Sequence, residues 1–149
     1  MEIIELITFL EKFDIEETKI TNFVKNKIII EKNENLFLRQ NKFKNNQIFD
    51  DNLIFIQLKN LLPSKYLLNF IFNNTKNKAE LKSEKQAMNF TYSKNLAFES
   101  IASDIRFIKG KYYLIIFKNK LLGYVEKEKG DKKHPLQNLF DIGEYLKEN

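Results

Sequence analysis

The sequence predicts an α+β protein made of two small domains. Apolar side chains in residues 2–13 follow the i, i+3, i+4, i+7 spacing of one helical face, whereas residues 111–125 form two apolar runs around a polar turn. The polar segment Asn73–Lys78 lies between these patterns and indicates a linker. We therefore expect a small N-terminal α/β domain at residues 1–75 and a second domain at residues 76–149.

The N-terminal domain is expected to combine helices with a small sheet. The apolar face of its first helix consists of Ile3, Leu6, Ile7, Leu10 and Phe13. Ile28–Ile30 and Leu36–Leu38 predict a hairpin with a turn near Asn33. Leu53–Leu58 is a third strand candidate, and Pro63 is expected to start the next helix because proline is tolerated in a first helical turn.

The second domain carries the clearest strand pattern of the chain. Ala79–Ser83 predicts a short strand, Glu84–Lys94 a short helix, and Leu96–Ile108 a strand with an irregular bend. The runs on either side of Lys118–Lys120 predict a β-hairpin with a basic tip. A short closing helix is expected to begin at Asp141, which suits the N-cap position.

Composition excludes several kinds of site. The chain has no cysteine and one histidine, so it holds neither disulfides nor the thiolate or imidazole clusters that bind zinc. The carboxylate pairs Glu16–Glu17 and Asp50–Asp51 are alternatives for a hard cation, but acids are routine at helix starts and turns. We expect no metal and no cofactor.

The N-terminal segment does not have the pattern of a targeting signal. It carries Glu2, Glu5 and Glu11 instead of a cationic start. Its apolar runs are a few residues long, far below the ~18 residues that span a bilayer. We expect no signal peptide and no membrane partner, and a cytoplasmic location.

Basic charge is concentrated in one stretch of the second domain. The net charge is +5, and residues 106–133 hold nine basic side chains against the acids Glu126, Glu128 and Asp131. Lysines on a hairpin and its following loop can contact a phosphate backbone and release counterions. The plain alternative is a lysine-rich, solvated surface. The lysines proposed for this surface are Lys118, Lys120, Lys127, Lys129, Lys132 and Lys133.

A resemblance to a known family rests on three consecutive segments: L-L-G-Y-V at 121–125, the basic loop at 126–135 and D-I-G-E-Y-L-K-E at 141–148. With the upstream residues Phe90–Asn95, they resemble the C-terminal PUA domain of the Nip-seven family of ribosome-biogenesis proteins over roughly residues 88–149. Residues 1–75 match that family in length and layout. Where the family often has Tyr-Gly, this chain has Tyr92-Ser93.

The resemblance implies a PUA-type β-barrel domain after the N-terminal α/β domain. It also implies a non-catalytic RNA-binding protein that acts in large-subunit ribosome biogenesis and pre-rRNA processing, in the cytoplasm or, in a eukaryote, the nucleolus. Lys132 and Lys133 occupy the basic pair before the proline of the family's basic loop, so they carry over as RNA contacts. The expected ligand is a single-stranded or irregular region of pre-rRNA.

Aromatic side chains interleaved with the lysines are candidates for base stacking. Tyr112 and Tyr113 are the two candidates, since exposed aromatic faces stack on unpaired bases. Alternate residues of a strand face opposite sides, so one of the two should be buried. Phe117 and Tyr124 are expected in the core.

Two other functions are compatible with the sequence. The chain could be an adaptor that docks other assembly proteins through residues 1–75, or an accessory subunit of an RNA-modifying or RNA-processing machine. It shows no phosphate-binding glycine loop, serine elbow or metal-binding helix motif. We therefore expect it not to be an enzyme and assign no catalytic residues.

Overall fold

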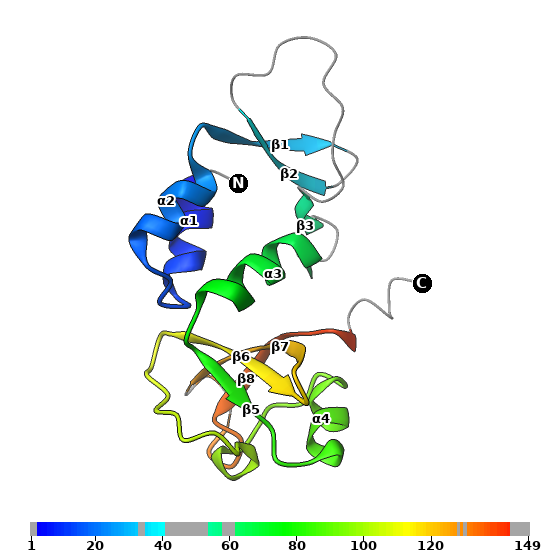
Figure 1. The fold of residues 1–149 in the computed structure, drawn as a ribbon. Helices are drawn as coiled ribbons and strands as arrows, with labels where there is room; N and C mark the ends of the chain where they lie inside the picture. Colours follow the sequence, from blue (N-terminus) through cyan, green and yellow to red (C-terminus); the bar gives the residue numbers. More distant parts are fainter. Residues whose placement is uncertain are drawn as a thin grey trace. The chain divides into compact units, whose positions relative to one another are not determined.

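The computed structural model describes residues 3–32, 35–40, 54–57, 62–127, 129 and 131–143. The chain divides into two compact units, Met1–Thr75 (unit 1) and Lys76–Asn149 (unit 2), which are described separately. Together the described residues form four α-helices and two four-stranded sheets, a mixed α and β architecture (Figure 1). No helix in this part of the chain is long and apolar enough to cross a membrane.

Two short helices open unit 1. Helix α1 (Ile3–Glu11) buries Leu6 and Leu10 on the apolar face predicted from the sequence, and Phe13 is buried just beyond its end. Helix α2 (Glu17–Val24) buries Ile20 and Phe23. No helix was predicted over residues 17–24, because their apolar positions are too few to give a clear periodicity.

The sheet of unit 1 is antiparallel in the order β1-β2-β3-β4. Its strands are β1 (Lys27–Lys32), β2 (Asn35–Gln40), β3 (Ile54–Gln57) and β4 (Leu62–Pro63). The predicted hairpin is confirmed, since Ile30 pairs with Phe37, and so is the third strand. The residue expected at the hairpin turn, Asn33, lies outside the described residues. Leu36, Phe37 and Leu38 are all buried, so side chains on both faces of β2 are covered.

The prediction that Pro63 starts the third helix is wrong. Pro63 lies in β4 and pairs with Ile56 of β3. Helix α3 (Lys65–Asn74) begins after Ser64, whose Oγ accepts a hydrogen bond from Leu67 N at 3.1 Å. It continues through Asn74, so the expected linker is reduced to residues 75–77. At its end Thr75 Oγ1 donates to the Phe13 carbonyl at 2.5 Å, which fixes the helix to the α1–α2 turn.

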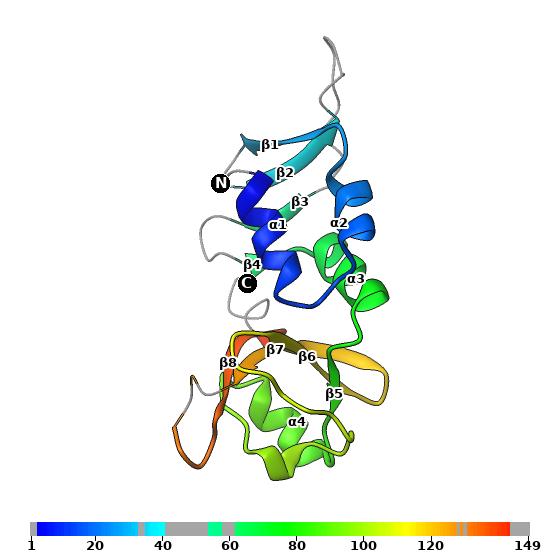
Figure 2. The ribbon, with the colours of Figure 1, turned by 90° about the vertical axis from the view of Figure 1, so that its left-hand side faces the viewer.

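Unit 2 is built on a sheet with the order β5-β6-β7-β8, shown from a second side in Figure 2. Its strands are β5 (Lys78–Glu80), β6 (Tyr112–Phe117), β7 (Lys120–Lys127) and β8 (Leu136–Asp141). Strand β5 runs parallel to β6, and the other pairs are antiparallel. The predicted hairpin is confirmed, and its tip is a two-residue turn in which Lys118 and Asn119 have positive φ angles of 47° and 63°. Strand β8 was not predicted.

The segment between helix α4 (Glu84–Phe90) and β6 corrects the prediction of a strand over Leu96–Ile108. It contains one turn of 3-10 helix, η2 (Phe98–Ser100), and two isolated bridges. Leu96 bridges to Leu136 on β8, and Ile101 bridges to Leu81 just after β5. The segment therefore reaches from one edge strand to the other. The described strands nevertheless form open sheets, neither of which is closed into a barrel.

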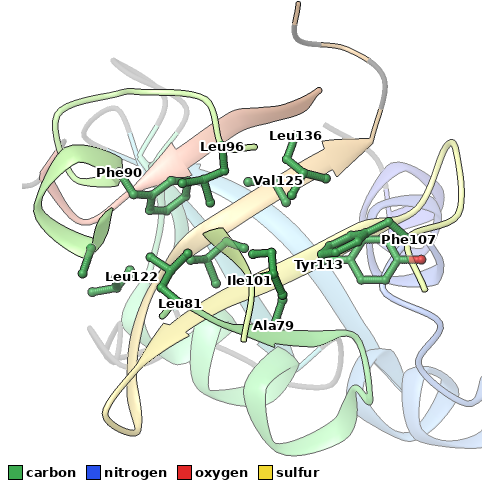
Figure 3. Packing of buried hydrophobic residues seen from close by; sticks show 12 residues of the cluster. Ala79, Leu81, Phe90, Leu96, Ile101, Phe107, Tyr113, Leu122, Val125 and Leu136 are labelled. Carbon is green, nitrogen blue, oxygen red and sulfur yellow. The ribbon is translucent and has the colours of Figure 1, made fainter. Parts of the chain in front are cut away.

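One face of the unit 2 sheet carries the core, which α4 and the 96–107 segment cover (Figure 3). Phe107 packs edge-on against Tyr113 with ring centroids 4.7 Å apart. The Tyr113 hydroxyl accepts from Ile108 N at 2.7 Å and donates to the Arg106 carbonyl at 3.3 Å. On the opposite face, the Tyr124 ring lies 5.6 Å from Tyr112 and 5.8 Å from Phe140.

A buried carboxylate joins β8 to the turn after α4. Asp141 is 1% exposed, and its Oδ2 accepts from Ser93 N at 3.1 Å and from Asn138 Nδ2 at 2.9 Å. Its Oδ1 accepts from Gly143 N at 2.8 Å, the bond expected of an N-cap residue. The rest of the predicted closing helix, residues 144–149, lies outside the described residues. Asn138 Nδ2 also donates to the Phe90 carbonyl at 2.9 Å, so two side chains of β8 hold this turn.

Replacing Asp141 with asparagine should destabilise the protein by about 1–3 kcal/mol, although the shape is unchanged. Both carboxylate oxygens accept N–H groups, so either orientation of the amide leaves its NH₂ facing a donor. Urea unfolding measures the loss. The control is Asp104→Asn at an exposed site, which should change stability by less than about 0.5 kcal/mol. Equal effects of the two substitutions would show that the network is not stabilising.

Candidate functional site

The structure separates the predicted lysines into two groups. Lys118 and Lys120 are exposed at the β6–β7 turn, whereas Lys127 ends β7 and the others follow it. Seven residue steps at about 3.3 Å each place Lys120 and Lys127 roughly 23 Å apart along the strand. The basic loop at 126–135 follows, of which residues 128 and 130 lie outside the described residues. Its lysines are Lys127, Lys129, Lys132 and Lys133.

Asp131 organises the basic loop. Its Oδ1 accepts from His134 N at 2.7 Å and from Lys133 N at 2.9 Å, and lies 3.4 Å from His134 Nδ1. The hydrogen bond from the His134 backbone, with a smaller contribution from Lys133, lowers the pKa of the Asp131 carboxyl. Lys132 and Lys133 are exposed on the loop held in this way. The predicted pair of RNA contacts therefore lies on a defined turn.

An open cleft of about 480 Å³ borders the basic loop. We call it the amide cleft because three of its lining residues carry side-chain amides. It is lined by Gln86, Asn89, Ser93, Lys94, Asn95, Leu96, Ala97, Ser100, Asp131 and His134. The Gln86 Oε1 atom is buried and has no hydrogen-bond partner among the described residues. The cleft thus offers amide donors and acceptors with a lysine and a histidine.

Hydrogen bonds with the β8 residues Leu136, Asn138 and Asp141 hold the wall of the amide cleft. Ser93 has a φ of 66°, a left-handed conformation that favours glycine, and its backbone N–H is bound by Asp141. Asn138 N donates to Asn95 Oδ1 at 2.9 Å. Leu96 exchanges two backbone hydrogen bonds with Leu136, of 2.9 and 3.1 Å. The turn that lines the cleft is therefore fixed to the sheet before any ligand binds.

A second hollow of about 300 Å³ lies next to the same segment and the same loop. We call it the Phe98 groove. It is lined by Phe98, Ile101, Ser103, Ile105, Arg106, Phe107 and Lys127. Residues 97–101 contribute to both hollows, because Ala97 and Ser100 line the amide cleft while Phe98 and Ile101 line the groove. The basic loop likewise contributes to both.

The structure places the two predicted stacking tyrosines differently. Tyr113 is 2% exposed and hydrogen-bonded in the core, so its assignment as a stacking residue is wrong. Tyr112 is partly exposed and stacks on the buried Tyr124. Because side chains alternate between the two faces of a strand, one of the two tyrosines was predicted to be buried, but the pattern did not identify which one. Phe98 is 43% exposed but was not among the predicted stacking residues, because the sequence pattern assigned it to a strand.

No protein-family model matches the chain, and no curated protein matches it significantly. The described residues contain no group of three or more acidic, histidine or cysteine side chains placed to hold a metal ion. Of the two carboxylate pairs considered for a cation, Glu16–Glu17 is exposed at the start of α2, and Asp50–Asp51 lies outside the described residues. The function is therefore argued from the two hollows and the loop between them.

The order of the basic loop should depend on pH through Asp131. Its pKa is lowered in the folded protein, so the stabilisation is present at neutral pH and is lost as the pH falls below about 4, through the folded-state pKa. NMR titration of the Asp131 carboxyl should give a midpoint below that of free aspartate, with the Lys133 and His134 amides shifting together. Asp131→Asn keeps an acceptor oxygen and should remove this pH dependence. Identical titrations of the two amides in both proteins would contradict the assignment.

Proposed function

We propose that the chain is a non-catalytic RNA-binding protein whose unit 2 binds single-stranded or irregular RNA. The observation that carries this proposal is the position of the basic loop, whose residues border both the amide cleft and the Phe98 groove. A polar cleft beside a lysine-rich loop suits RNA, because unpaired bases present hydrogen-bonding edges while their phosphates attract cations.

We propose further that unit 2 is a PUA-type domain and that the protein acts in large-subunit ribosome biogenesis and pre-rRNA processing. The support is the resemblance of residues 88–149 to the Nip-seven family, together with the two bridges. These bridges extend the open sheet at both edges, from β8 through Leu96 and from the end of β5 through Ile101. Bridges at both edges are compatible with the barrel closure that the resemblance implies.

The two lysine groups should contribute unequally to binding. The basic loop holds four lysines, of which Lys127 lines the Phe98 groove, whereas Lys118 and Lys120 lie at the other end of β7. In this proposal a strand in the groove contacts Lys127 and continues along Lys129, Lys132 and Lys133, which are exposed on the loop. The tip lysines then form a second cationic patch, roughly 23 Å away, which only a longer RNA would reach.

The direct test of RNA binding is fluorescence anisotropy with the full chain, a short unstructured RNA and its DNA counterpart, across about 50–200 mM salt. Tighter binding to RNA, with an affinity that falls steeply with salt, is the expected result. Absence of binding at the lowest salt would reject the proposal and would favour the docking of a protein partner through residues 1–75.

The double substitution Lys132→Gln/Lys133→Gln should weaken RNA binding and flatten its salt dependence. Loss of two phosphate contacts on a single strand lowers the slope of log K against log salt by about 1.4, and reversal of both charges to glutamate should weaken binding further. The control is Lys19→Gln/Lys25→Gln, which removes the same charge from exposed sites at α2 in unit 1. If both pairs have equal effects, binding depends on net charge and not on the basic loop.

A further inference from the structure

The Phe98 groove contains an exposed aromatic ring in a defined position. Phe98 keeps 43% of its surface exposed, although a phenylalanine gains about 1.5–3 kcal/mol when it is fully buried. Its ring lies 5.9 Å from that of Phe107, which is 7% exposed and belongs to the core. One part of the ring therefore packs on the core while another part remains open to the groove.

The backbone around Phe98 is well anchored. Ile101 N donates to the Phe98 carbonyl at 3.1 Å within the 3-10 turn, and Ser100 N donates to the Ala97 carbonyl at 3.1 Å. Beyond the turn, Lys82 N donates to the Ser100 carbonyl at 3.0 Å and Ala102 N donates to the Glu80 carbonyl at 2.7 Å. The ring is thus presented by a segment bonded to the sheet edge, so little conformational entropy is lost when a ligand binds to it.

Two cations accompany the ring. Arg106 and Lys127 line the groove, and its described lining contains no acidic side chain. Lys127 Nζ lies 6.0 Å from the centroid of the Phe98 ring, at the outer limit of a cation–π contact. The register of β7 accounts for this position, because Lys127 lies on the same face as the core residue Val125 and pairs with Leu136.

We propose that Phe98, Arg106 and Lys127 form a stacking site for one unpaired RNA nucleotide. The base stacks on the Phe98 ring, and the two cations contact the phosphates on either side of it. This inference rests on the proposed RNA-binding function and names a binding site within it. The positive lining fits a nucleotide better than an apolar peptide or an acyl chain, and 300 Å³ is at the lower end of the usual range for small-ligand sites.

The site is continuous with the amide cleft. Because residues 97–101 and the basic loop line both hollows, a strand that stacks one base on Phe98 can place a neighbouring nucleotide in the cleft. Stacking accepts any base, since every base has a π face, whereas amide groups read the edges of a base. We therefore assign affinity without base preference to the Phe98 groove and leave discrimination between bases to the cleft.

The test compares a short uridine oligomer with a ribose-phosphate oligomer of equal length that lacks bases. Both carry the same phosphate charge, so the ratio of their affinities reports contacts to the bases, and the change of this ratio in a Phe98 variant reports stacking on that ring. The wild-type chain should prefer the base-bearing oligomer by at least the value of one stacked base, about 5- to 150-fold. Phe98→Leu should lose most of this preference and keep its affinity for the base-free oligomer, whereas Phe98→Trp should retain the preference.

Matched variants separate stacking from charge and from general exposure. Arg106→Gln and Lys127→Gln should weaken binding of both oligomers by the same factor. Tyr92 is a control aromatic, 69% exposed and absent from the lining of both hollows, and Tyr92→Leu should leave the preference unchanged. An equal loss of preference in Tyr92→Leu and Phe98→Leu would reject the assignment to this groove.

The remaining outcomes distinguish this inference from the proposed function. If the wild-type chain binds the uridine oligomer and Phe98→Leu keeps the full preference, the stacking site is wrong while RNA binding stands. If Phe98→Leu and Phe98→Trp both weaken the two oligomers equally, Phe98 has a structural role and the stacking site is again wrong. If the wild-type chain binds neither oligomer, both proposals are rejected.

Discussion

The hydrogen bonds of Asp141 are the constraint on which the candidate site depends. A carboxylate that is 1% exposed is stable only if its oxygens are fully bonded, and here three N–H donors reach them, from Ser93, Asn138 and Gly143. Because Asn138 also bonds the Phe90 carbonyl, the network locks the turn after α4 onto β8. That turn forms a wall of the amide cleft. The D-I-G segment at 141–143 thus holds a turn that lies between the core and the surface.

Residues 97–101 line both the amide cleft and the Phe98 groove, and the basic loop borders both hollows. The two hollows differ in chemistry. The amide cleft offers side-chain amides with a lysine and a histidine, whereas the groove offers an aromatic ring with two cations. A chain of phosphates and bases is the ligand that uses both, since it alternates charge with flat, hydrogen-bonding rings. This complementarity, together with the resemblance of residues 88–149 to the Nip-seven family, is the basis on which we propose RNA as the ligand.

Sequence alone predicted the elements whose side chains follow a regular period, and failed where the backbone breaks that period. The apolar face of α1 and the β6–β7 hairpin are confirmed because neither depends on distant contacts for its pattern. Strand β8 was missed because a bulge places Leu136 on the core face and Phe140 against Tyr124 on the other, so its residues do not alternate. Phe98 was missed for a related reason: bridges at Leu96 and Ile101 hold a 3-10 turn where a continuous strand was expected. Tyr113, and not Tyr112, lies in the core because it packs against Phe107. No local sequence pattern places Phe107 beside it.

The most direct test of this account is an NMR titration of the full chain with a short uridine oligomer, following backbone amides. We predict that the shifted amides cluster in residues 93–101 and 127–134, the two segments that border both hollows, while the amides of unit 1 remain unchanged. Shifts confined to residues 3–75, or no shifts at oligomer concentrations that saturate known RNA-binding domains, would contradict it.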